Sequence, residues 1–445
     1  MFRSSRCLSW LMALGLGLSA AACGRAVQPL PAGRSPQGLA AAQAPRSADA
    51  RRAPGRLPIV SGEGALRSQS GSPAWTLLVH LAADNDLYDF GVGDLNEMEA
   101  ALPSDGSLEV LVLFDGMEIG DSAVYRIRRD PGGYNDTIVS EKLDLPAIVP
   151  PSGEINSGDR ATVQRFLEWG ARAARGPRTM ITFWDHGSGL FRRGGNPLTL
   201  GFGWDDDGSN LETADLSGLC AAFKAARGRA AEIVSFDACL MGHGELVYQL
   251  EGLAGLYIAS EHLIPGTGWD YEGWFERWAR LADRSPLAVS NALVDAFARS
   301  YQLDRKEVTL SVIDVPRFNG TVLPALDAFV AAALRAMPAQ KQAFQQARQR
   351  TRRFYNQDCA DLGDFLQRVQ RDVKDPEVSQ AAAVTREALG QAVLREHHTT
   401  PNFDGATGAV LYFPTPAQRY NVMYDQPARV RFADRAWRTF LKAYR

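Results

Sequence analysis

This sequence lacks long apolar runs and a strong excess of charge of one sign. It also lacks an even number of cysteines in its folded part. Beyond the N-terminus there is no run of 18 or more apolar residues, so no later membrane-spanning helix is expected. The formal net charge is −3 over 445 residues, which gives no reason to expect nucleic acid as a partner. A hydrophobic content of 45% with 22% charged residues is typical of a globular protein with a sizeable core.

The chain has only five cysteines, and two of them, Cys7 and Cys23, lie near the N-terminus. The remaining three are Cys220, Cys239 and Cys359, which is an odd number. In an exported protein an unpaired cysteine suggests a reactive thiol. A disulfide between Cys220 and Cys359 would leave Cys239 free, but the sequence does not establish this pairing.

Residues 1–22 have the pattern of an export signal. Arg3 and Arg6 precede an apolar segment, Leu8–Leu18, that is too short for a comfortable transmembrane helix. The small residues before Cys23 resemble a bacterial lipobox, which predicts lipidation of Cys23 and contact with a membrane through that anchor only. The same residues also fit ordinary signal cleavage. We therefore expect an exported protein, either an outer-membrane or cell-surface lipoprotein or a secreted one.

Folded structure is expected from about Trp75 onward. Residues 23–72 are rich in Ala, Arg, Pro and Gly and predict a disordered tether or pro-segment. Over residues 73–316, buried strand patterns alternate with helix patterns, which indicates an α/β fold with a mostly parallel sheet flanked by helices. Residues 317–445 predict a largely helical C-terminal extension, either a separate subdomain or further layers on the same core. The expected elements are strands at 75–83, 108–115, 179–184, 233–236, 256–260, 308–315 (the last of the main sheet) and 408–413, and helices at 93–102, 159–174, 213–227, 242–253, 321–352, 361–396 and 432–443.

Two strand patterns end abruptly in reactive residues, His186 and Cys239. Sites of parallel α/β sheets lie at the carboxyl ends of strands, so these side chains are expected to meet. A cysteine attacks a carbonyl as thiolate, and a nearby histidine activates it and then protonates the leaving amine. The backbone N–H groups of Gly187 and Cys239 would stabilise the oxyanion, and a helix from Gly242 would add a favourable dipole. Either residue alone would more often be structural, but the two together favour a cysteine peptidase.

The motifs DHGSG at 185–189 and DACLM at 237–241 resemble the His and Cys motifs of the clostripain family of cysteine peptidases. A Gly-rich segment, PGTGWDY at 265–271, is similar to a loop of the same family. The resemblance covers roughly Trp75 to Val315. It implies a caspase-like fold, shared with gingipains, legumains and separase, and a His/Cys dyad without an obligatory third member. It also implies protein or peptide substrates and no cofactor for the chemistry.

Asp237 stands two residues before Cys239, on the same side of an extended strand. The resemblance implies that this carboxylate lines the S1 pocket and selects Arg or Lys at P1, which suits the pairing of carboxylate with guanidinium. The alternative is a structural aspartate that hydrogen-bonds the turn. In the Gly-rich loop Thr267 occupies the middle of PGTG, and Asp270 is the nearest acid for a second contribution to S1.

Two further features lie between His186 and Cys239. The basic pair Arg192-Arg193 is a candidate for self-cleavage, because members of this family are often activated between the two motifs; the alternative is a solvated basic turn. Asp205-Asp206-Asp207 is a candidate Ca²⁺ site, since hard cations prefer clustered carboxylates, and the resemblance implies Ca²⁺ as the ion. The alternative is a hydrated loop.

Two other classes of function stay open at this point. A zinc site from Cys239, His243 and His186 is one, because His243 follows Cys239 by four residues. The other is a catalytically silent cell-envelope lipoprotein that uses the same fold as a binding module. Of the remaining histidines, His80 is expected in the core, His262 near the cleft, and His397-His398 on the surface before a loop.

Overall fold

The computed structural model describes residues 72–135, 137–190 and 201–445. All of these residues belong to one unit, Ala42–Arg445. The export signal, Cys23 and the Arg192-Arg193 pair lie outside the described residues. Their predictions therefore rest on the sequence alone.

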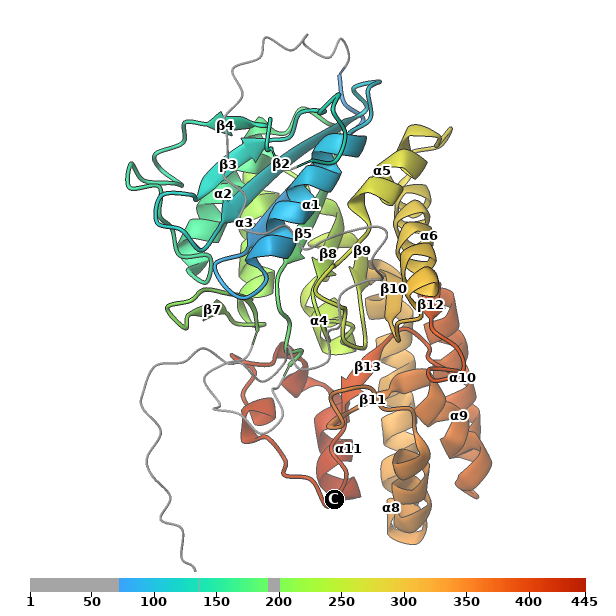
Figure 1. Cartoon of the computed structure of the whole chain (residues 1–445). Helices are drawn as coiled ribbons and strands as arrows, with labels where there is room; N and C mark the ends of the chain where they lie inside the picture. The colour runs from blue at the N-terminus through green and yellow to red at the C-terminus, as the bar shows by residue number, and fades with distance from the viewer. Residues whose placement is uncertain (1–71, 136, 191–200) are drawn as a thin grey trace, which may run out of the picture. The chain divides into compact units, whose positions relative to one another are not determined.

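Nine strands of the described part of the chain form one sheet, in the order β12-β10-β9-β8-β5-β1-β2-β3-β4 (Figure 1). The five strands from β9 to β2 are parallel, whereas β10 and β12 at one end and β3 and β4 at the other are antiparallel to their neighbours. Two short pairs, β6 with β7 and β11 with β13, lie outside this sheet. The strand bounds are β1 Trp75–Ala82, β2 Leu108–Asp115, β3 Ala123–Arg126, β4 Glu141–Leu143, β5 Arg178–Trp184, β6 Phe202–Trp204, β7 Asn210–Leu211, β8 Ala231–Asp237, β9 Ala254–Ala259, β10 Thr309–Asp314, β11 Cys359–Asp361, β12 Val393–His398 and β13 Val410–Tyr412.

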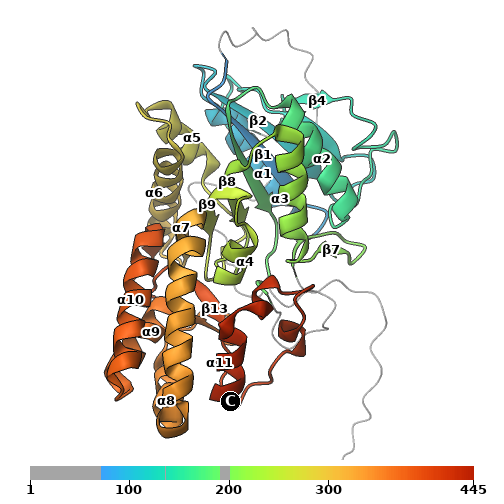
Figure 2. The ribbon, with the colours of Figure 1, turned by 180° about the vertical axis from the view of Figure 1, so that it is seen from behind.

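The central strands are apolar on both faces because helices cover both faces. Every residue of β1 and β2 is buried. Successive side chains of β1 alternate between two cores: Leu77 and Val79 pack in one cluster, and Leu78 packs in the other. Figure 1 shows α1 in front of the sheet, and the view from behind in Figure 2 shows α2 and α3 on the opposite face.

The helices begin where the sequence supplies caps. Asp159 accepts hydrogen bonds from the N–H groups of Ala161 and Thr162 at the start of α2, and Ser285 caps α6 ahead of Pro286. The helix bounds are α1 Tyr88–Ala101, α2 Arg160–Ala173, α3 Asp215–Arg227, α4 Gly244–Gln249, α5 Tyr271–Ala279, α6 Pro286–Asp304, α7 Val315–Arg317, α8 Leu323–Arg350, α9 Leu362–Asp372, α10 Pro376–Ala392 and α11 Ala436–Tyr444, with a π-helical turn η1 Phe318–Val322 and 3₁₀ turns η2 Val422–Asp425 and η3 Arg431–Asp434.

The C-terminal region shares the core of the sheet. Phe329 of α8, Phe365 of α9 and Phe440 of α11 belong to the same buried cluster as Leu78 of β1 and Phe183 of β5. β12 pairs with β10 and becomes the edge strand of the main sheet. The α/β class, the mostly parallel sheet and the helical C-terminal region are confirmed, and residues after 316 add both a helical layer and a strand.

Several predicted elements are corrected. The strand ending at Val315 is not the last of the main sheet, because β12 lies beyond it, and residues 393–398 are strand rather than helix and surface loop. The helix after Cys239 is shorter than expected and begins at Gly244. The segment 202–211, for which no strand or helix was expected, is a small hairpin, β6–β7.

One helical segment, Val315–Arg350, is long and apolar enough to cross a membrane by length and composition. Half of its most apolar window is buried inside the protein. Its core-facing residues include Leu326, Phe329 and Phe344, which are fully or almost fully buried. A core helix passes the same test of length and apolarity, and the burial of this segment is that of a core helix.

Candidate active site

The sheet order brings the His and Cys motifs to the same edge. β5 and β8 are adjacent and parallel, with Trp184 opposite Asp237 in the register. Both strands end there, so His186 and Cys239 follow at equivalent positions, two residues beyond this pair. β1, the other neighbour of β5, ends at Ala82 and delivers residues 84–86 to the same edge. The predicted meeting point of the two motifs is therefore built by three parallel strands.

The His186 ring is oriented by a carboxylate from the loop after β1. Its Nε2 lies 2.7 Å from Oδ1 of Asp86, and about a quarter of the side chain is exposed. This hydrogen bond holds the pKa of Asp86 below its usual range. The Trp204 ring stands edge-on to the imidazole, with the centroids 6.4 Å apart. A carboxylate on one ring nitrogen favours the protonated imidazole and fixes the ring plane.

Asp185 anchors the backbone from which His186 projects. Its buried carboxylate accepts hydrogen bonds from Asn85 Nδ2 at 2.9 Å and from the Trp204 N–H. Burial raises the pKa of Asp185 to about 7, although these bonds favour the ionised form. Asn85 Nδ2 also lies 3.1 Å from the Trp204 carbonyl oxygen, so the loop after β1, the His loop and the β6–β7 hairpin are hydrogen-bonded together.

The Cys239 thiol rests against a backbone segment rather than at a helix N-terminus. Its Sγ accepts a hydrogen bond from the Ile264 N–H at 3.2 Å and donates to the Ile264 carbonyl at 3.3 Å. Leu240 follows in the left-handed region with φ of 63°, and α4 begins only at Gly244. Burial, with the nearby charges of Asp237 and Asp185, raises the pKa of Cys239 to about 11. The expected dipole assistance from the helix is therefore not available, and the thiol is protonated in this arrangement.

Gly187 packs directly on the peptide of Cys239. A Cβ placed on Gly187 would lie 2.1 Å from the Cys239 carbonyl oxygen and 3.1 Å from its nitrogen. Only glycine permits this approach, because real Cβ contacts are not shorter than 3.0 Å. Gly187 also forms an isolated antiparallel bridge with Phe202 of β6. The backbones of the two predicted oxyanion donors are thus adjacent.

Asp237, predicted for the S1 pocket, is buried beneath the Gly-rich loop. Its Oδ2 accepts a hydrogen bond from the Trp269 N–H at 3.0 Å, and Oδ1 has no hydrogen bond of normal geometry from the described residues. The nearby Tyr271 hydroxyl favours the ionised carboxylate, but burial dominates and raises the pKa of Asp237 to about 7. Gly268, with φ of +55°, allows the loop to approach, since its Cβ would lie 2.9 Å from Oδ2.

The two other residues predicted for S1 have structural contacts in the same loop. The Thr267 hydroxyl lies 3.1 Å from the Tyr301 hydroxyl, which donates to the Gly268 carbonyl at 2.6 Å. Asp270 caps α5 by accepting from the Gly273 N–H at 2.8 Å. These contacts fix the shape of the loop over Asp237.

The predicted alternatives built on cysteine and histidine are not assembled. Cys220 and Cys359 are both buried and free, so the suggested disulfide is absent. His243 is buried beside Gly189, and its Nε2 lies 3.9 Å from Cys359 Sγ. Within residues 72–135, 137–190 and 201–445, the group of His, Cys, Asp and Glu side chains that could hold a metal ion contains neither histidine nor cysteine. The proposed zinc set is therefore wrong for this part of the chain.

The remaining histidines lie where their surroundings are apolar or hydrogen-bonded. His80 is buried in β1, as predicted, and burial lowers the pKa of its ring to about 4. His262 stacks near Phe354 and Phe403, and its Nδ1 accepts from the Tyr355 N–H. The carbonyl oxygen of His262 accepts from the Leu240 N–H, which places the residue beside the Cys loop.

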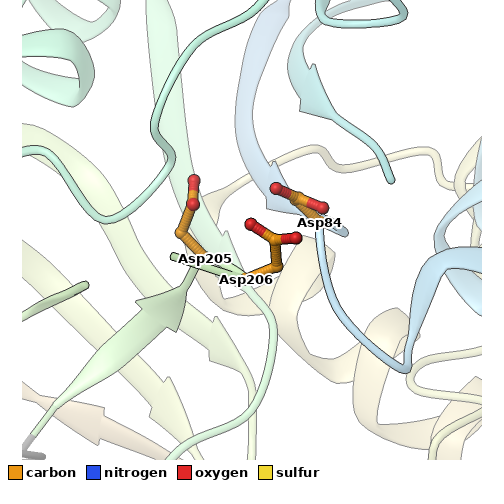
Figure 3. A group of neighbouring side chains, drawn as sticks. All are labelled: Asp84, Asp205 and Asp206. Atoms are coloured by element: carbon orange, nitrogen blue, oxygen red, sulfur yellow. The ribbon is translucent and has the colours of Figure 1, made fainter. Parts of the chain in front are cut away.

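An acidic group lies beside the His loop, and it differs from the predicted one. The carboxylates of Asp84, Asp205 and Asp206 offer ligand atoms that all lie within 4.8 Å of one another (Figure 3). Asp207, predicted as a member, instead accepts from Asn156 Nδ2 and from the Ser209 N–H, both at 2.7 Å. Asp84, which follows the end of β1, is the third member of this group in place of Asp207.

Two residues of this site are not predicted by the sequence motifs. Asp86 orients His186, and Asn85 ties the loops together, yet in the sequence both belong only to a short polar loop. The signal was present, since Asp84-Asn85-Asp86 follows a fully buried strand as the His and Cys motifs follow theirs. The contact of Cys239 with Ile264 had no sequence signal, because it is made by backbone atoms.

Comparisons with known proteins agree with this geometry. Clostripain from Hathewaya histolytica is 24% identical over 224 residues, which are 45% of this chain and 41% of clostripain. A secreted C11 cysteine protease from Bacteroides thetaiotaomicron, solved with an irreversible peptide inhibitor, has a TM-score of 0.60 at 21% identity and covers 84% of this chain and 99% of that chain. An inactive zymogen C11 protease from Parabacteroides distasonis has a TM-score of 0.57 at 15% identity, covering 83% and 99%. At these identities the solved structures show the fold.

The sequence also matches the clostripain family over residues 79–444, which is most of the chain and includes the C-terminal region. The match with clostripain itself spans only about two fifths of the length of that protein. The resemblance inferred from the two motifs is confirmed, and this chain belongs to the clostripain family.

Proposed function

We propose that this protein is a cysteine endopeptidase that uses His186 and Cys239 and cleaves after Arg or Lys. The observation that supports it most is the position of these residues, after the adjacent parallel strands β5 and β8. The close packing of Gly187 on Cys239 adds a pair of neighbouring backbone groups at the place where an oxyanion would form. Membership of the clostripain family supports the same reaction.

In the proposed reaction the Cys239 proton passes to His186, and Sγ attacks the substrate carbonyl carbon. The N–H groups of Gly187 and Cys239 hold the oxyanion of the tetrahedral intermediate. Protonated His186 then gives its proton to the leaving amine, and a thioester remains on Cys239. Water, deprotonated by His186, hydrolyses the thioester and regenerates the thiol. No cofactor takes part in these steps.

In this proposal the contact of the Cys239 thiol with Ile264 belongs to a resting form of the site. The thiol is hydrogen-bonded to Ile264 on both its donor and acceptor sides, and its pKa is raised to about 11. Substrate that enters between the Cys loop and residues 264–268 would displace this contact and direct the thiol to His186. The Asp86 carboxylate stabilises the imidazolium formed by that transfer, so we assign Asp86 as a positioning residue.

Selectivity for a basic P1 side chain is assigned to Asp237. Its Oδ1 is buried without a normal hydrogen bond from the described residues, and a guanidinium or ammonium would supply the missing donor. Thr267 and Asp270 shape the loop that covers this carboxylate. The arriving cation would also lower the pKa of Asp237 from about 7, so binding and ionisation favour each other.

Processing and location complete the proposal. Self-cleavage at Arg192-Arg193 would activate the enzyme between its two motifs, and export with lipidation of Cys23 would hold it at the cell envelope. The description of one structural relative as secreted supports export. Wild-type and Cys239→Ala protein, incubated and then sequenced at new N-termini, test self-cleavage; a wild-type chain that stays uncut would contradict it.

The function itself is tested with fluorogenic peptides that differ only at P1, carrying Arg, Lys, Ala, Asp or Leu. We expect hydrolysis of the Arg and Lys peptides alone, and none with Cys239→Ala. Cleavage after another residue would retain the His/Cys pair and discard the role of Asp237. No cleavage and no labelling of Cys239 by a substrate-like thiol probe, even after limited proteolysis of the segment 187–210, would support the silent binding module instead.

A further inference from the structure

We propose that Glu97 of α1 supplies a second carboxylate for the P1 side chain beside Asp237, and that the two acids together select Arg over Lys. Both carboxylates lie near the Tyr271 hydroxyl. Burial raises the pKa of this hydroxyl well above its usual value, and the charges of Asp237, Asp94 and Glu97 raise it further. The proposal rests on the proposed function, because it concerns the side chain of the residue after which Cys239 cleaves.

The Gly-rich loop does not bring a second carboxylate to Asp237. Thr267 carries no charge, and its hydroxyl lies 3.1 Å from the Tyr301 hydroxyl. Asp270 is turned to the start of α5, where its carboxylate accepts from the Gly273 N–H at 2.8 Å. A second acid would therefore have to come from another element. Helix α1 packs against α5, which begins where this loop ends.

Two acidic residues of α1 approach this pocket. Asp94 and Glu97 are three residues apart, so they lie on one face of the helix, and both are buried. Asp94 accepts from the Trp184 indole N–H at 2.7 Å, and Trp184 is the register partner of Asp237 on the adjacent strand. Glu97 Oε2 accepts from the Glu272 N–H at 3.4 Å, in the first turn of α5. The acidic face of α1 therefore reaches both the strand end that carries Asp237 and the helix start that follows the Gly-rich loop.

Two buried oxygen atoms at this place have unused hydrogen-bonding capacity. Asp237 Oδ1 and Tyr271 Oη have no hydrogen-bond partner of normal geometry among the residues that the structure describes, and both side chains are almost completely buried. Buried polar groups in native proteins rarely lack such partners. The surroundings are aromatic, since the rings of Trp269 and Trp274 each lie 6.1 Å from the Tyr271 ring. A flat cation with several N–H donors would satisfy both oxygens and contact the rings.

The charge of Glu97 already acts on Asp237 when no substrate is bound. Burial is the main reason that the pKa of Asp237 is raised to about 7, and the nearby Glu97 raises it further. Two buried carboxylates that repel each other ionise together more easily when a cation contacts both. A basic side chain that binds Asp237 and Glu97 at the same time therefore gains from both charges and removes their repulsion.

Contact with two carboxylates favours Arg over Lys. The guanidinium is planar and carries five N–H donors in a fixed fork, so one edge can bind Asp237 while another binds Glu97. The lysine ammonium is a compact and more strongly hydrated charge, which costs more to remove from water and has no such fork. With Asp237 alone, Arg and Lys substrates should be used about equally well. With both carboxylates, kcat/KM should be at least about tenfold higher for Arg.

The test is hydrolysis of two fluorogenic peptides that differ only in Arg or Lys at P1. In Glu97→Gln the Arg-to-Lys ratio of kcat/KM should fall from at least about tenfold to about threefold or less, mostly through a higher KM for the Arg peptide. The matched control is Glu99→Gln, the same change in the same helix, because the Glu99 carboxylate accepts instead from the N–H groups of Val139 and Ser140. Its ratio should stay within about twofold of wild type. The ratio compares two substrates of one preparation, so partial unfolding does not change it.

A wild-type ratio below about threefold, or an unchanged ratio in Glu97→Gln, overturns the proposal. If Glu97 acted only through its charge on Asp237, Glu97→Gln would use both peptides better by the same factor. Glu97→Asp separates contact from charge, because it keeps the charge and withdraws the carboxylate by one methylene group. Direct contact predicts a lower ratio in this variant, whereas the charge alone predicts the wild-type ratio.

Failure of the proposed function is measured separately. If no peptide is cleaved, calorimetry on the full chain carrying Cys239→Ala compares a blocked tripeptide ending in arginine amide with its lysine counterpart. At least about tenfold tighter binding of the arginine peptide, lost on adding Glu97→Gln, would support the pocket and refute only the peptidase activity. Equal binding of the two peptides, or no binding, would overturn the role of Glu97 as well.

Discussion

Gly187 offers a sharp test of the proposed site, because its role depends on the absence of a single carbon atom. In Gly187→Ala the new Cβ would lie 2.1 Å from the carbonyl oxygen of Cys239. Since such contacts do not fall below 3.0 Å, the two loops must separate by roughly 0.9 Å. The obstacle is backbone, not the end of a flexible side chain, so the movement must be shared by the His and Cys loops.

A displacement of this size acts directly on the reacting groups. Misplacement of catalytic groups by about 1 Å is associated with losses on the order of 10²-fold in rate. We therefore expect kcat/KM of Gly187→Ala to fall about 100-fold or more, with a loss of stability of about 1–3 kcal/mol from overpacking. The loss should appear in kcat more than in KM, since Asp237 belongs to strand β8 and is held beneath the Gly-rich loop by the Trp269 N–H, outside the two loops that must separate.

The assay is hydrolysis of an Arg-P1 peptide, with urea unfolding to measure stability. Gly390→Ala is the matched control: it lies in α10, a Cβ there would have no neighbour within 4 Å, and alanine is favoured over glycine in helices. It should keep full activity and equal or greater stability. If Gly187→Ala retained kcat/KM within threefold of wild type, the packing of the two loops would not be what positions the oxyanion donors and the dyad.

Three further predictions concern acidic residues. Asp86→Asn should lower kcat by about 10- to 100-fold, with KM changed less. The reason is that a charge-assisted hydrogen bond contributes roughly 1.5–3 kcal/mol and here stabilises the imidazolium of His186. A kcat equal to that of wild type would show that His186 does not depend on the Asp86 carboxylate. Burial raises the pKa of Asp237 to about 7, so kcat/KM for an Arg peptide should rise from pH 6 to 8 as the carboxylate ionises. A Leu peptide cleaved by Asp237→Asn gives the pH dependence of the His/Cys pair itself, and the Arg peptide should rise more steeply than this reference. Burial raises the pKa of Glu261 well above its normal value, and the neighbouring Asp361 and Glu396 raise it further. The folded state therefore retains a proton on Glu261 that the unfolded state loses above about pH 4.5. Stability from this group therefore falls as pH rises, and Glu261→Gln should raise the melting temperature more at pH 8 than at pH 5; an equal change at both values would contradict the sign.

The meeting of the His and Cys motifs could be predicted because it depends only on local patterns and one topological rule. Each motif follows an apolar strand, and adjacent parallel strands present their carboxyl ends at one edge. The start of the helix after Cys239 could not be predicted in the same way. Residues 242–253 have helical spacing, but Gly242 packs against the backbone of Glu261 and donates to the Ser260 carbonyl, so the chain must turn before α4 can begin.

The C-terminal region shows a second limit of local patterns. Residues 393–398 are mostly charged or histidine and continue an alanine-rich helix, so within them only Val393 favours a strand. Their conformation is set by pairing with β10, a contact distant in sequence. Similarly, the three consecutive aspartates 205–207 form one group in the sequence, but the turn sends Asp207 toward Asn156. The partner from β1 is visible only once the chain is folded.

The acidic residues at this edge of the sheet have a common electrostatic consequence. Asp84, Asp185, Asp205 and Asp237 all have raised pKa values, and burial is the largest cause for each. Buried carboxylates that keep high pKa values are groups whose ionisation a nearby cation would stabilise, so this condition favours a basic substrate side chain at Asp237. Asp237 ends β8 beneath the Gly-rich loop, whereas Asp84 and Asp205 lie on the β1 side, and Asp185 with its bonds to Asn85 and Trp204 stands between them. The proposed S1 pocket therefore predicts that Asp237→Asn lowers kcat/KM for Arg and Lys peptides relative to a Leu peptide, whereas Asp84→Asn leaves this ratio unchanged.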